Sequence, residues 1–375
     1  MKKLLVKNIG LLATPEGKSA HRGEEQGKIK FLKDAWVLIE DGIIASVGTG
    51  AVPAVEGAEV VDAEGHLVTP GLVDAHTHLI FGGWRQNELG LKLHGASYRG
   101  IQSTTNATRQ ASEEELTEKA AKALDEMMGF GTTTVEAKSG YGLATEHELK
   151  ALEVIKDLND HHRMDLVATF MGAHLVPAEY KSNREEYVRL VCEEMMPKVK
   201  EQGIAKFCDV FCEADTFTVE ESRQVLEAGL KYGLRPKIHA DEIEAIGGSQ
   251  LAGEIGAISA EHLIVCPPEG IESMAKGGVI ACLLPATSFN LGAVFAPARD
   301  MVAAGVPVAM ATDFNPGSCP CLNMQFVINL GCLRYRLTPE QALTAVTLNG
   351  AAAICRADRI GSIEPGKQAD LLIWN

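Results

Sequence analysis

The pattern of apolar and polar positions changes twice along the chain. Over residues 1–65, segments such as LLVKNIGLL and DAWVLIEDGIIASVG alternate apolar and polar residues around Asp-Gly and Glu-Gly turns, which predicts short antiparallel strands. The final segment, GSIEPGKQADLLIWN, predicts more strands joined by a Pro-Gly turn. Strands at both ends indicate a small β-sandwich domain assembled from residues 1–65 and 356–375.

Residues 66–355 between these ends alternate short apolar runs with amphipathic helices, as at residues 112–130 and 184–203. Ser112 with Glu115 forms a capping-box start for the first of these helices. Such alternation predicts βαβ units and a parallel sheet. The eight apolar runs are LVTPGLVDAHTHL, GTTTVEA, MDLVATFMGAH, CDVFCEA, PKIHADE, AISAEHL, VIACLLPAT and VPVAMATDFNP. Eight strands close a barrel, so the predicted fold class is α/β, a (β/α)₈ TIM-like barrel spanning residues 66–355.

Nearly every one of these runs ends in a polar or ionisable side chain. The residues at the ends are His76 with His78, Glu136, His174, Glu213, His239 with Glu242, His262, Thr287 and Asp313. Enzymes with this fold build their active sites at the carboxyl ends of the barrel strands. The recurrence therefore supports the barrel and predicts where its chemistry lies.

Four of these residues predict a metal site. His76 and His78, in DAHTH, stand two positions apart in a strand and therefore share one face. His239 ends the fifth run and Asp313 ends the eighth. Three imidazoles with one carboxylate predict a site for one divalent or trivalent ion, zinc or iron, with room left for a water molecule.

An ion of this kind lowers the pKa of bound water towards about 7, so the predicted chemistry is hydrolysis at a carbonyl carbon. Glu242, beside His239 in HADE, is the first candidate for carrying the proton of the water to the leaving nitrogen. Asp313 could share that role. His262, in AEHL, could polarise the carbonyl or steady the hydroxide.

Longer motifs carry a family resemblance over nearly the whole chain: TPGLVDAHTHLIFGG, KSGYGL, FMGAHLVP, IHADEIEAIGG, AEHL and TDFNPGSCP. The chain resembles the amidohydrolase superfamily and, within it, the imidazolonepropionase family. This resemblance implies hydrolysis of the cyclic amide C–N bond of 4-imidazolone-5-propanoate to N-formimino-L-glutamate in histidine degradation. It also implies a homodimer.

The resemblance further implies a set of substrate-binding residues. Arg85, just past the paired histidines, can bind a carboxylate through two parallel hydrogen bonds. Tyr141 has a glycine on each side, which lets its loop approach a ligand closely. The full set is Arg85, Tyr98, Tyr141, His174, Asn315, Gly317 and Ser318.

The chain differs from the family pattern in two places. The stretch after Tyr98, RGIQSTTNAT, is shorter and poorer in glycine than in relatives. Relatives continue beyond LLIWN with another hairpin and strand, so the expectation is a truncated sequence or a reduced small domain. Lys138, in EAKSGYG, does not stand where two-metal members of the superfamily carry a carbamylated lysine, which predicts one metal.

Composition restricts the partners. The net charge of −15 argues against nucleic acid, since such a surface repels phosphate backbones. No run approaches the roughly 20 apolar residues that a membrane span needs. None of the nine cysteines forms a C-x-x-C pair, which indicates reduced thiols in a reducing compartment. We expect a cytoplasmic protein with a small-molecule substrate.

Two other functions fit parts of this pattern. An aminohydrolase, or deaminase, of a purine or pyrimidine-like base would use the same metal site with the same glutamate and histidine. Arg85 together with Tyr141 favours an anionic substrate over a neutral base. A binding or scaffolding protein that kept the barrel and lost its chemistry would lack metal ligands, whereas all four are present here.

Overall fold

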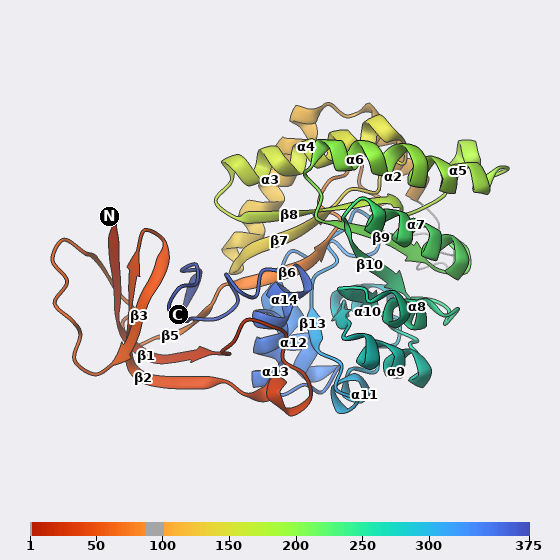
Figure 1. Cartoon of the computed structure of the whole chain (residues 1–375). Coiled ribbons are helices and arrows are strands. Elements are labelled where there is room, and N and C mark those ends of the chain that lie inside the picture. Colours follow the sequence, from red (N-terminus) through yellow and green to blue (C-terminus); the bar gives the residue numbers. More distant parts are fainter. Residues whose placement is uncertain (1, 87–100) are drawn as a thin grey trace.

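The computed structural model describes residues 2–86 and 101–375. Its central feature is a sheet of eight parallel strands in the order β13-β12-β11-β10-β9-β8-β7-β6 (Figure 1). The strands are β6 (Leu72–Thr77), β7 (Thr132–Lys138), β8 (Asp165–Ala173), β9 (Phe207–Cys212), β10 (Arg235–Ala240), β11 (Ser259–His262), β12 (Ile280–Leu283) and β13 (Val308–Met310).

Backbone hydrogen bonds join the two outer strands of this sheet. The Asp313 N–H donates to the His76 carbonyl oxygen at 3.1 Å, and the His78 N–H donates to the Phe314 carbonyl oxygen at 2.8 Å. The segment after β13 thus pairs with β6, and the sheet closes into a barrel. The predicted (β/α)₈ fold is confirmed, with one strand for each of the eight apolar runs.

Helices cover the outside of the barrel. The α-helices are α2 (Ile101–Gln110), α3 (Glu113–Gly129), α4 (Thr145–His161), α5 (Arg184–Leu190), α6 (Met196–Gln202), α7 (Val219–Lys231), α8 (Gly248–Ile255), α9 (Pro268–Gly277), α10 (Pro285–Leu291), α11 (Ala298–Ala303), α12 (Met324–Leu333), α13 (Pro339–Ala345) and α14 (Leu348–Ala353). Ser112 and Glu115 form the predicted capping box at the start of α3. A π-helical turn, η3 (Val191–Met195), joins α5 to α6, so the helix predicted at residues 184–203 is present with a local widening.

The two chain ends meet in a separate sheet of six strands (Figure 1). Its strands are β1 (Lys3–Thr14), β2 (Lys30–Glu40), β3 (Ile43–Thr49), β4 (Glu59–Asp62), β5 (Leu67–Pro70) and β14 (Leu371–Trp374). β14 pairs antiparallel with β5, which opposes Leu372 to Thr69. The expected sandwich therefore takes the form of one continuous sheet built from both ends. Two 3₁₀ turns, η1 (Gly23–Gly27) and η2 (Ala178–Tyr180), complete the elements of the described residues.

Gly71 divides the first predicted barrel run between the two sheets. β5 precedes it in the small sheet, and β6 follows it in the barrel. A Cβ at Gly71 would lie 2.2 Å from Thr133 Oγ1, so only glycine allows this close approach. The prediction of a single barrel strand over LVTPGLVDAHTHL is wrong for its first residues, because alternation alone does not show which sheet a strand joins.

Among the described residues, no helix is both long and apolar enough to cross a membrane. All nine cysteines are free thiols, as the sequence predicts.

Candidate metal centre and active site

Four side chains that are far apart in sequence meet at the carboxyl end of the barrel. His76 lies on β6 and His78 follows it; His239 lies on β10, and Asp313 follows β13. Asp313 Oδ1 lies 3.5 Å from His76 Nε2 and 3.6 Å from His78 Nε2. His239 Nε2 lies 3.3 Å from His78 Nε2. The structure thus brings the four predicted ligands to one buried point.

The polar atoms at this point fit a metal ion. His76 Nε2 and Asp313 Oδ1 are buried without a hydrogen-bond partner among the described residues, and such atoms are costly to bury. Burial, with nearby cationic groups, lowers the pKa of His76 and His78 well below 6.5, so both neutral rings offer a lone pair. Zinc and iron accept such imidazole and carboxylate donors. The role of these residues as ligands stays a prediction.

His262, at the end of β11, lies between this point and Glu242. One possible metal-ligand atom from each of His262, His76 and Asp313 lies within 4.8 Å of the other two. His262 Nε2 also lies 3.6 Å from Glu242 Oε2. Burial lowers the pKa of His262 well below 6.5, which keeps the ring neutral. Two of the three predicted catalytic side chains, Glu242 and His262, are therefore adjacent, and His262 also lies beside Asp313, the third.

A second glutamate holds the loop that carries Glu242. Glu213, just past β9, accepts the backbone N–H of Ile243 at 2.9 Å and that of Glu244 at 3.0 Å. These bonds fix the backbone of the two residues that follow Glu242. The side chain of Glu242 itself is 12% exposed. Glu242 is therefore presented from a fixed loop.

Each of three predicted ligands has a partner behind it. Glu261 Oε2 lies 2.9 Å from His76 Nδ1, and Asp209 Oδ1 lies 3.0 Å from His239 Nδ1. Thr287 donates to Asp313 Oδ2 at 2.6 Å. Carboxylates in such positions fix the tautomer and orientation of a ligand ring. Asp209 and Glu261 were not among the predicted site residues, although each is a charged residue inside an apolar run.

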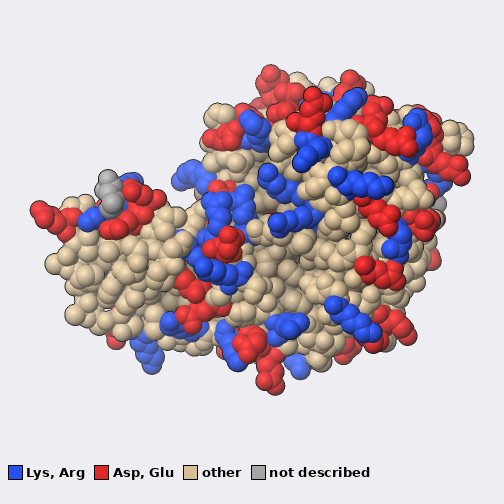
Figure 2. Space-filling model, in the orientation of Figure 1, with Lys and Arg blue, Asp and Glu red and all other residues tan. Residues whose placement is uncertain are grey.

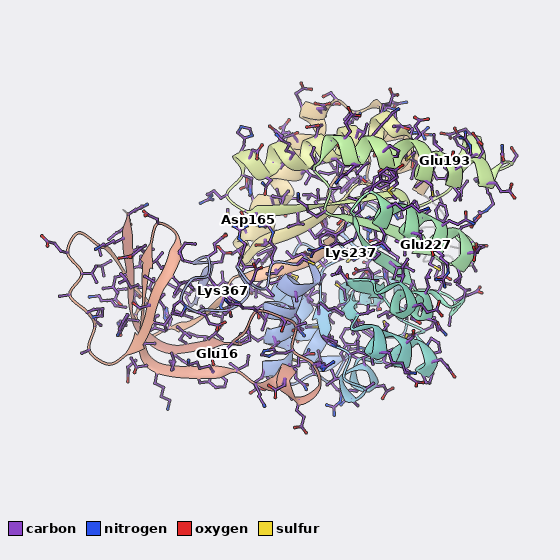
Figure 3. All side chains as sticks on the ribbon, viewed as in Figure 1. Glu16, Asp165, Glu193, Glu227, Lys237 and Lys367 are labelled. Carbon is purple, nitrogen blue, oxygen red and sulfur yellow. The ribbon has the colours of Figure 1, made fainter. Side chains whose placement is uncertain are left out.

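Beneath these partners lies a fully buried group of charges, which we call the buried charge cluster: Glu136, Lys138, Asp209, Lys237 and Glu261. Lys138 Nζ lies 2.7 Å from Glu136 Oε1 and 2.8 Å from Asp209 Oδ2. Lys237 Nζ lies 3.5 Å from both Glu136 Oε1 and Glu261 Oε1. Figure 3 places Lys237 near the middle of the barrel. The cluster joins the partner of His239 to the partner of His76.

Arg85 is buried against the loop that follows Asp313. Its backbone N–H donates to the Pro316 carbonyl oxygen at 2.9 Å. A Cβ on Gly317 would lie 1.8 Å from Arg85 Nη2, so this glycine makes room for the guanidinium. Asn315 Oδ1 accepts the N–H of Gly317 at 2.9 Å and that of Ser318 at 2.7 Å. The structure therefore brings together four of the predicted substrate residues.

Tyr141 and His174 lie beside His78, one of the predicted ligands. His174 stacks on His78 with ring centroids 4.9 Å apart, and Tyr141 meets His174 edge-on at 5.1 Å. His174 Nδ1 lies 2.9 Å from the Gly140 carbonyl oxygen. Burial lowers the pKa of His174 to about 3, so the ring is neutral and donates from Nδ1 to that oxygen. Its Nε2 is therefore left as an acceptor for a ligand.

The loop of Tyr141 is held from behind by Glu148 on α4. This buried carboxylate accepts the N–H of Gly140 at 2.9 Å and that of Leu143 at 2.8 Å. Gly140 has a φ of +108°, a conformation that favours glycine. Tyr98, the remaining predicted substrate contact, lies outside the described residues.

A barrel with buried histidines and an aspartate at its carboxyl end defines a class of hydrolases, and comparison with known proteins identifies it. A sequence model described as "Amidohydrolase family" matches residues 67–375. E. coli guanine deaminase has a similar structure, with a TM-score of 0.77 and 18% identity over 99% of this chain and 88% of that chain. The chain belongs to the amidohydrolase family.

Curated relatives refine this assignment. The imidazolonepropionase of Alkaliphilus metalliredigens is 51% identical over 388 residues, which cover 100% of this chain and 92% of the relative. The imidazolonepropionase of Geobacillus kaustophilus is 50% identical over 390 residues, with the same coverage of both chains. Within the amidohydrolase family, the chain therefore groups with the imidazolonepropionases.

Proposed function

We propose that this protein hydrolyses the cyclic amide C–N bond of 4-imidazolone-5-propanoate to give N-formimino-L-glutamate, a step of histidine degradation. One observation carries the proposal: the chain is 51% identical over its full length to a protein named imidazolonepropionase. The side chains that such a reaction needs lie around one buried point at the barrel mouth.

His76, His78, His239 and Asp313 hold a single metal ion, zinc or iron, in this proposal. The chemistry supplied by such an ion is Lewis acidity, which acidifies a water molecule and polarises a carbonyl group. The support is the pair of unpartnered atoms, His76 Nε2 and Asp313 Oδ1, and their separation of 3.5 Å.

Glu242, His262 and Asp313 handle the proton. A water oxygen adds to the ring carbonyl carbon, the carbon–nitrogen bond breaks, and the proton of the water reaches the leaving nitrogen. Glu242 is the first candidate for this transfer because its loop is fixed and it adjoins His262 at 3.6 Å. Asp313 is a second candidate because its carboxylate adjoins the rings of His76 and His78 at 3.5 and 3.6 Å.

Arg85 binds the propionate carboxylate in this proposal. It is a buried cation in an acidic chain, and its planar donors match a carboxylate. Tyr141 and His174 contact the ring, and Asn315, Gly317 and Ser318 form the loop that meets the product. Tyr98 is retained as a further substrate contact on the resemblance alone.

Three broader expectations also remain proposals. The chain forms a homodimer and works in the cytoplasm. Its domains divide as predicted into residues 1–65 with 356–375 and residues 66–355, except that β5 in the six-stranded sheet moves the first boundary to Gly71.

A substrate comparison tests the function. Purified protein should release N-formimino-L-glutamate from 4-imidazolone-5-propanoate and should leave guanine and cytosine unchanged. Deamination of either base, with no opening of the imidazolone, would replace the proposal with an aminohydrolase.

A further inference from the structure

The buried charge cluster spans the interior of the barrel. Glu136 and Lys138 lie on β7, Asp209 on β9, Lys237 on β10 and Glu261 on β11. β7 and β10 are not neighbours in the sheet, since β8 and β9 lie between them. The ion pair between Glu136 and Lys237, at 3.5 Å, therefore crosses the inside of the barrel.

Stability is a poor explanation for this cluster. Each of its five residues is completely buried, and a buried charge loses its hydration. Well-packed apolar residues in place of buried ion pairs are often neutral or stabilising. The contacts of the cluster instead lead to two predicted metal ligands, through Asp209 to His239 and through Glu261 to His76.

We infer that Lys138 is a positioning residue of the metal centre, an inference that rests on the proposed metal site. Its ammonium group lies 2.8 Å from Asp209 Oδ2, while Asp209 Oδ1 faces His239 Nδ1 at 3.0 Å. The lysine thereby holds the carboxylate that orients the ring of His239. Through Glu136 the same ammonium is linked to Lys237, and hence to Glu261 and His76.

The net charge of the buried charge cluster favours a cation at the predicted metal position. Three carboxylates and two ammonium groups leave one net negative charge next to the ligand rings. Carbamylation of Lys138 would replace its ammonium with an anion against Glu136 and Asp209. The contacts therefore also support an unmodified Lys138 and a single metal.

Zinc affinity tests this role separately from turnover. Lys138→Met keeps the length of the side chain and removes its charge. The matched control is Lys367→Met, since Lys367 is also buried but lies in the region of the small sheet, where it donates to the carbonyl oxygens of Gly17 and Ala357. Figure 3 labels both Lys367 and the barrel residue Lys237. Metal-free protein is titrated with zinc against a chelator, and its melting temperature is recorded.

We expect Lys138→Met to weaken zinc binding by about 10- to 100-fold, the usual effect of removing an outer-shell partner. Lys367→Met should keep the wild-type zinc affinity, whatever its effect on the melting temperature. Glu136→Gln, which is isosteric, serves if Lys138→Met does not fold and should weaken binding in the same direction. Wild-type zinc affinity in either folded cluster variant overturns the inference. Failure of the wild-type protein to bind zinc or iron overturns the proposed metal site itself.

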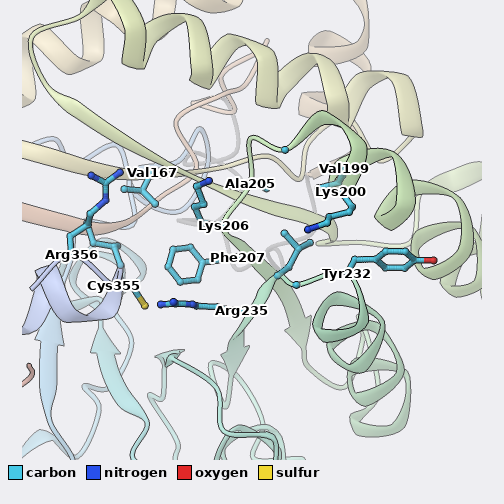
Figure 4. A pocket seen from close by; sticks show the side chains of 14 residues that line it. Val167, Val199, Lys200, Ala205, Lys206, Phe207, Tyr232, Arg235, Cys355 and Arg356 are labelled. Carbon is cyan, nitrogen blue, oxygen red and sulfur yellow. The ribbon is translucent and has the colours of Figure 1, made fainter. Parts of the chain in front are cut away.

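A second and independent feature lies at the other end of the barrel. A cavity of about 390 Å³ opens at the amino ends of β9 and β10, within the size range of small-molecule sites (Figure 4). Lys206 precedes β9 and Arg235 begins β10, whereas the predicted metal ligands lie at the opposite strand ends. Lys200, Arg356 and the buried ring of Phe207 also line it. We call it the cationic cavity.

The charges around the cationic cavity are unbalanced. Among the residues that the structure describes, four lysine and arginine side chains line it and no aspartate or glutamate does. The chain as a whole carries 50 acidic and 35 basic residues. Across residues 2–86 and 101–375, none of these four side chains forms an ion pair. Figure 2 shows lysine and arginine side chains gathered near the middle of the face that it displays. Such a concentration of positive charge attracts anions.

We propose that the cationic cavity binds a small molecule with at least two anionic groups. The separate positions of Lys206, Arg235 and Arg356 around Phe207 allow two groups to be held at once (Figure 4). Guanidinium and ammonium groups bind carboxylates and phosphates alike. The expected ligand is therefore a small polycarboxylate or a small polyphosphate, which share this anionic chemistry.

Calorimetric titration with citrate, a polycarboxylate, and with pyrophosphate, a polyphosphate, distinguishes these two classes of ligand. The double variant Lys206→Ala with Arg235→Ala is compared with Lys122→Ala with Lys276→Ala, which removes the same charge from surface ion pairs on α3 and α9. The wild-type protein and the surface double variant should bind at least one of the two anions. The cavity double variant should bind that anion with a dissociation constant at least about tenfold higher. Equal binding by both variants, or no binding by the wild type, overturns the proposal. Sedimentation that shows self-association lost only in the cavity variant would also overturn it, in favour of a second copy.

Discussion

The barrel and the small sheet bury different kinds of side chain. The small sheet packs around an apolar cluster of side chains that includes Ile9, Leu12, Val37 and Val68. The barrel also has apolar clusters, between its strands and helices, but it additionally encloses charges such as Lys138 and the predicted metal ligands. An apolar core stabilises through removal of surface from water, whereas buried charges must be paired to be tolerated at all. The difference indicates that the core of the small sheet serves stability alone, whereas the barrel also holds a charged interior that serves chemistry.

Removal of a predicted ligand should have the largest effect. His239→Ala should abolish metal binding and lower kcat/KM by about 10³-fold or more, since the ion contributes several kcal/mol to transition-state stabilisation. Elemental analysis and an imidazolone assay measure both. His161→Ala, at an exposed histidine on α4, is the control and should change neither. Full metal retention by His239→Ala would remove His239 from the ligand set.

Neutralising the proposed proton carrier should have the next largest effect. Glu242→Gln should lower kcat by about 10²- to 10⁴-fold, the usual contribution of a general acid or base. Metal content should stay at the wild-type level, which separates this variant from a ligand variant. A kcat within a few-fold of wild type would transfer the proton role to Asp313 or His262.

Loss of the proposed carboxylate clamp should act mainly on binding. Arg85→Ala should raise KM by about 10- to 100-fold, since a hydrogen bond to a charged group contributes about 1.5–3 kcal/mol. Metal content should not change. An unchanged KM would show that the propionate group is held elsewhere.

A small change in the apolar core should separate stability from chemistry. Ile9→Val should lower the free energy of unfolding by about 0.5–1.5 kcal/mol, because one buried methylene is lost. Its kcat, KM and metal content should match wild type. A changed KM would show that the small sheet influences the site, and the contrast between the two interiors would fail.

The barrel was predictable because the pattern that indicates each of its strands lies within a few consecutive residues. Each of the eight strands lies within one of the short apolar runs of the sequence, and a polar residue ends or follows nearly every strand. The division at Gly71 was not predictable, since it depends on which sheet accepts β5. His76 and Asp313 come together because strand ends share one rim, a consequence of the fold alone.

The outer partners of the ligands were harder to predict. Asp209 and Glu261 lie inside apolar strands, and nothing local shows that their side chains reach His239 and His76. The position of Lys138 in the sequence indicates only that the site holds one metal. Its ion pairs depend on strands brought together by barrel closure, which no sequence period reveals.

Metal removal and restoration test the central claim most directly. Wild-type protein is stripped with a chelator, assayed with 4-imidazolone-5-propanoate, and then titrated with zinc or iron. We predict that activity disappears on stripping and returns fully at one ion per chain. Undiminished hydrolysis by the stripped protein would contradict the account.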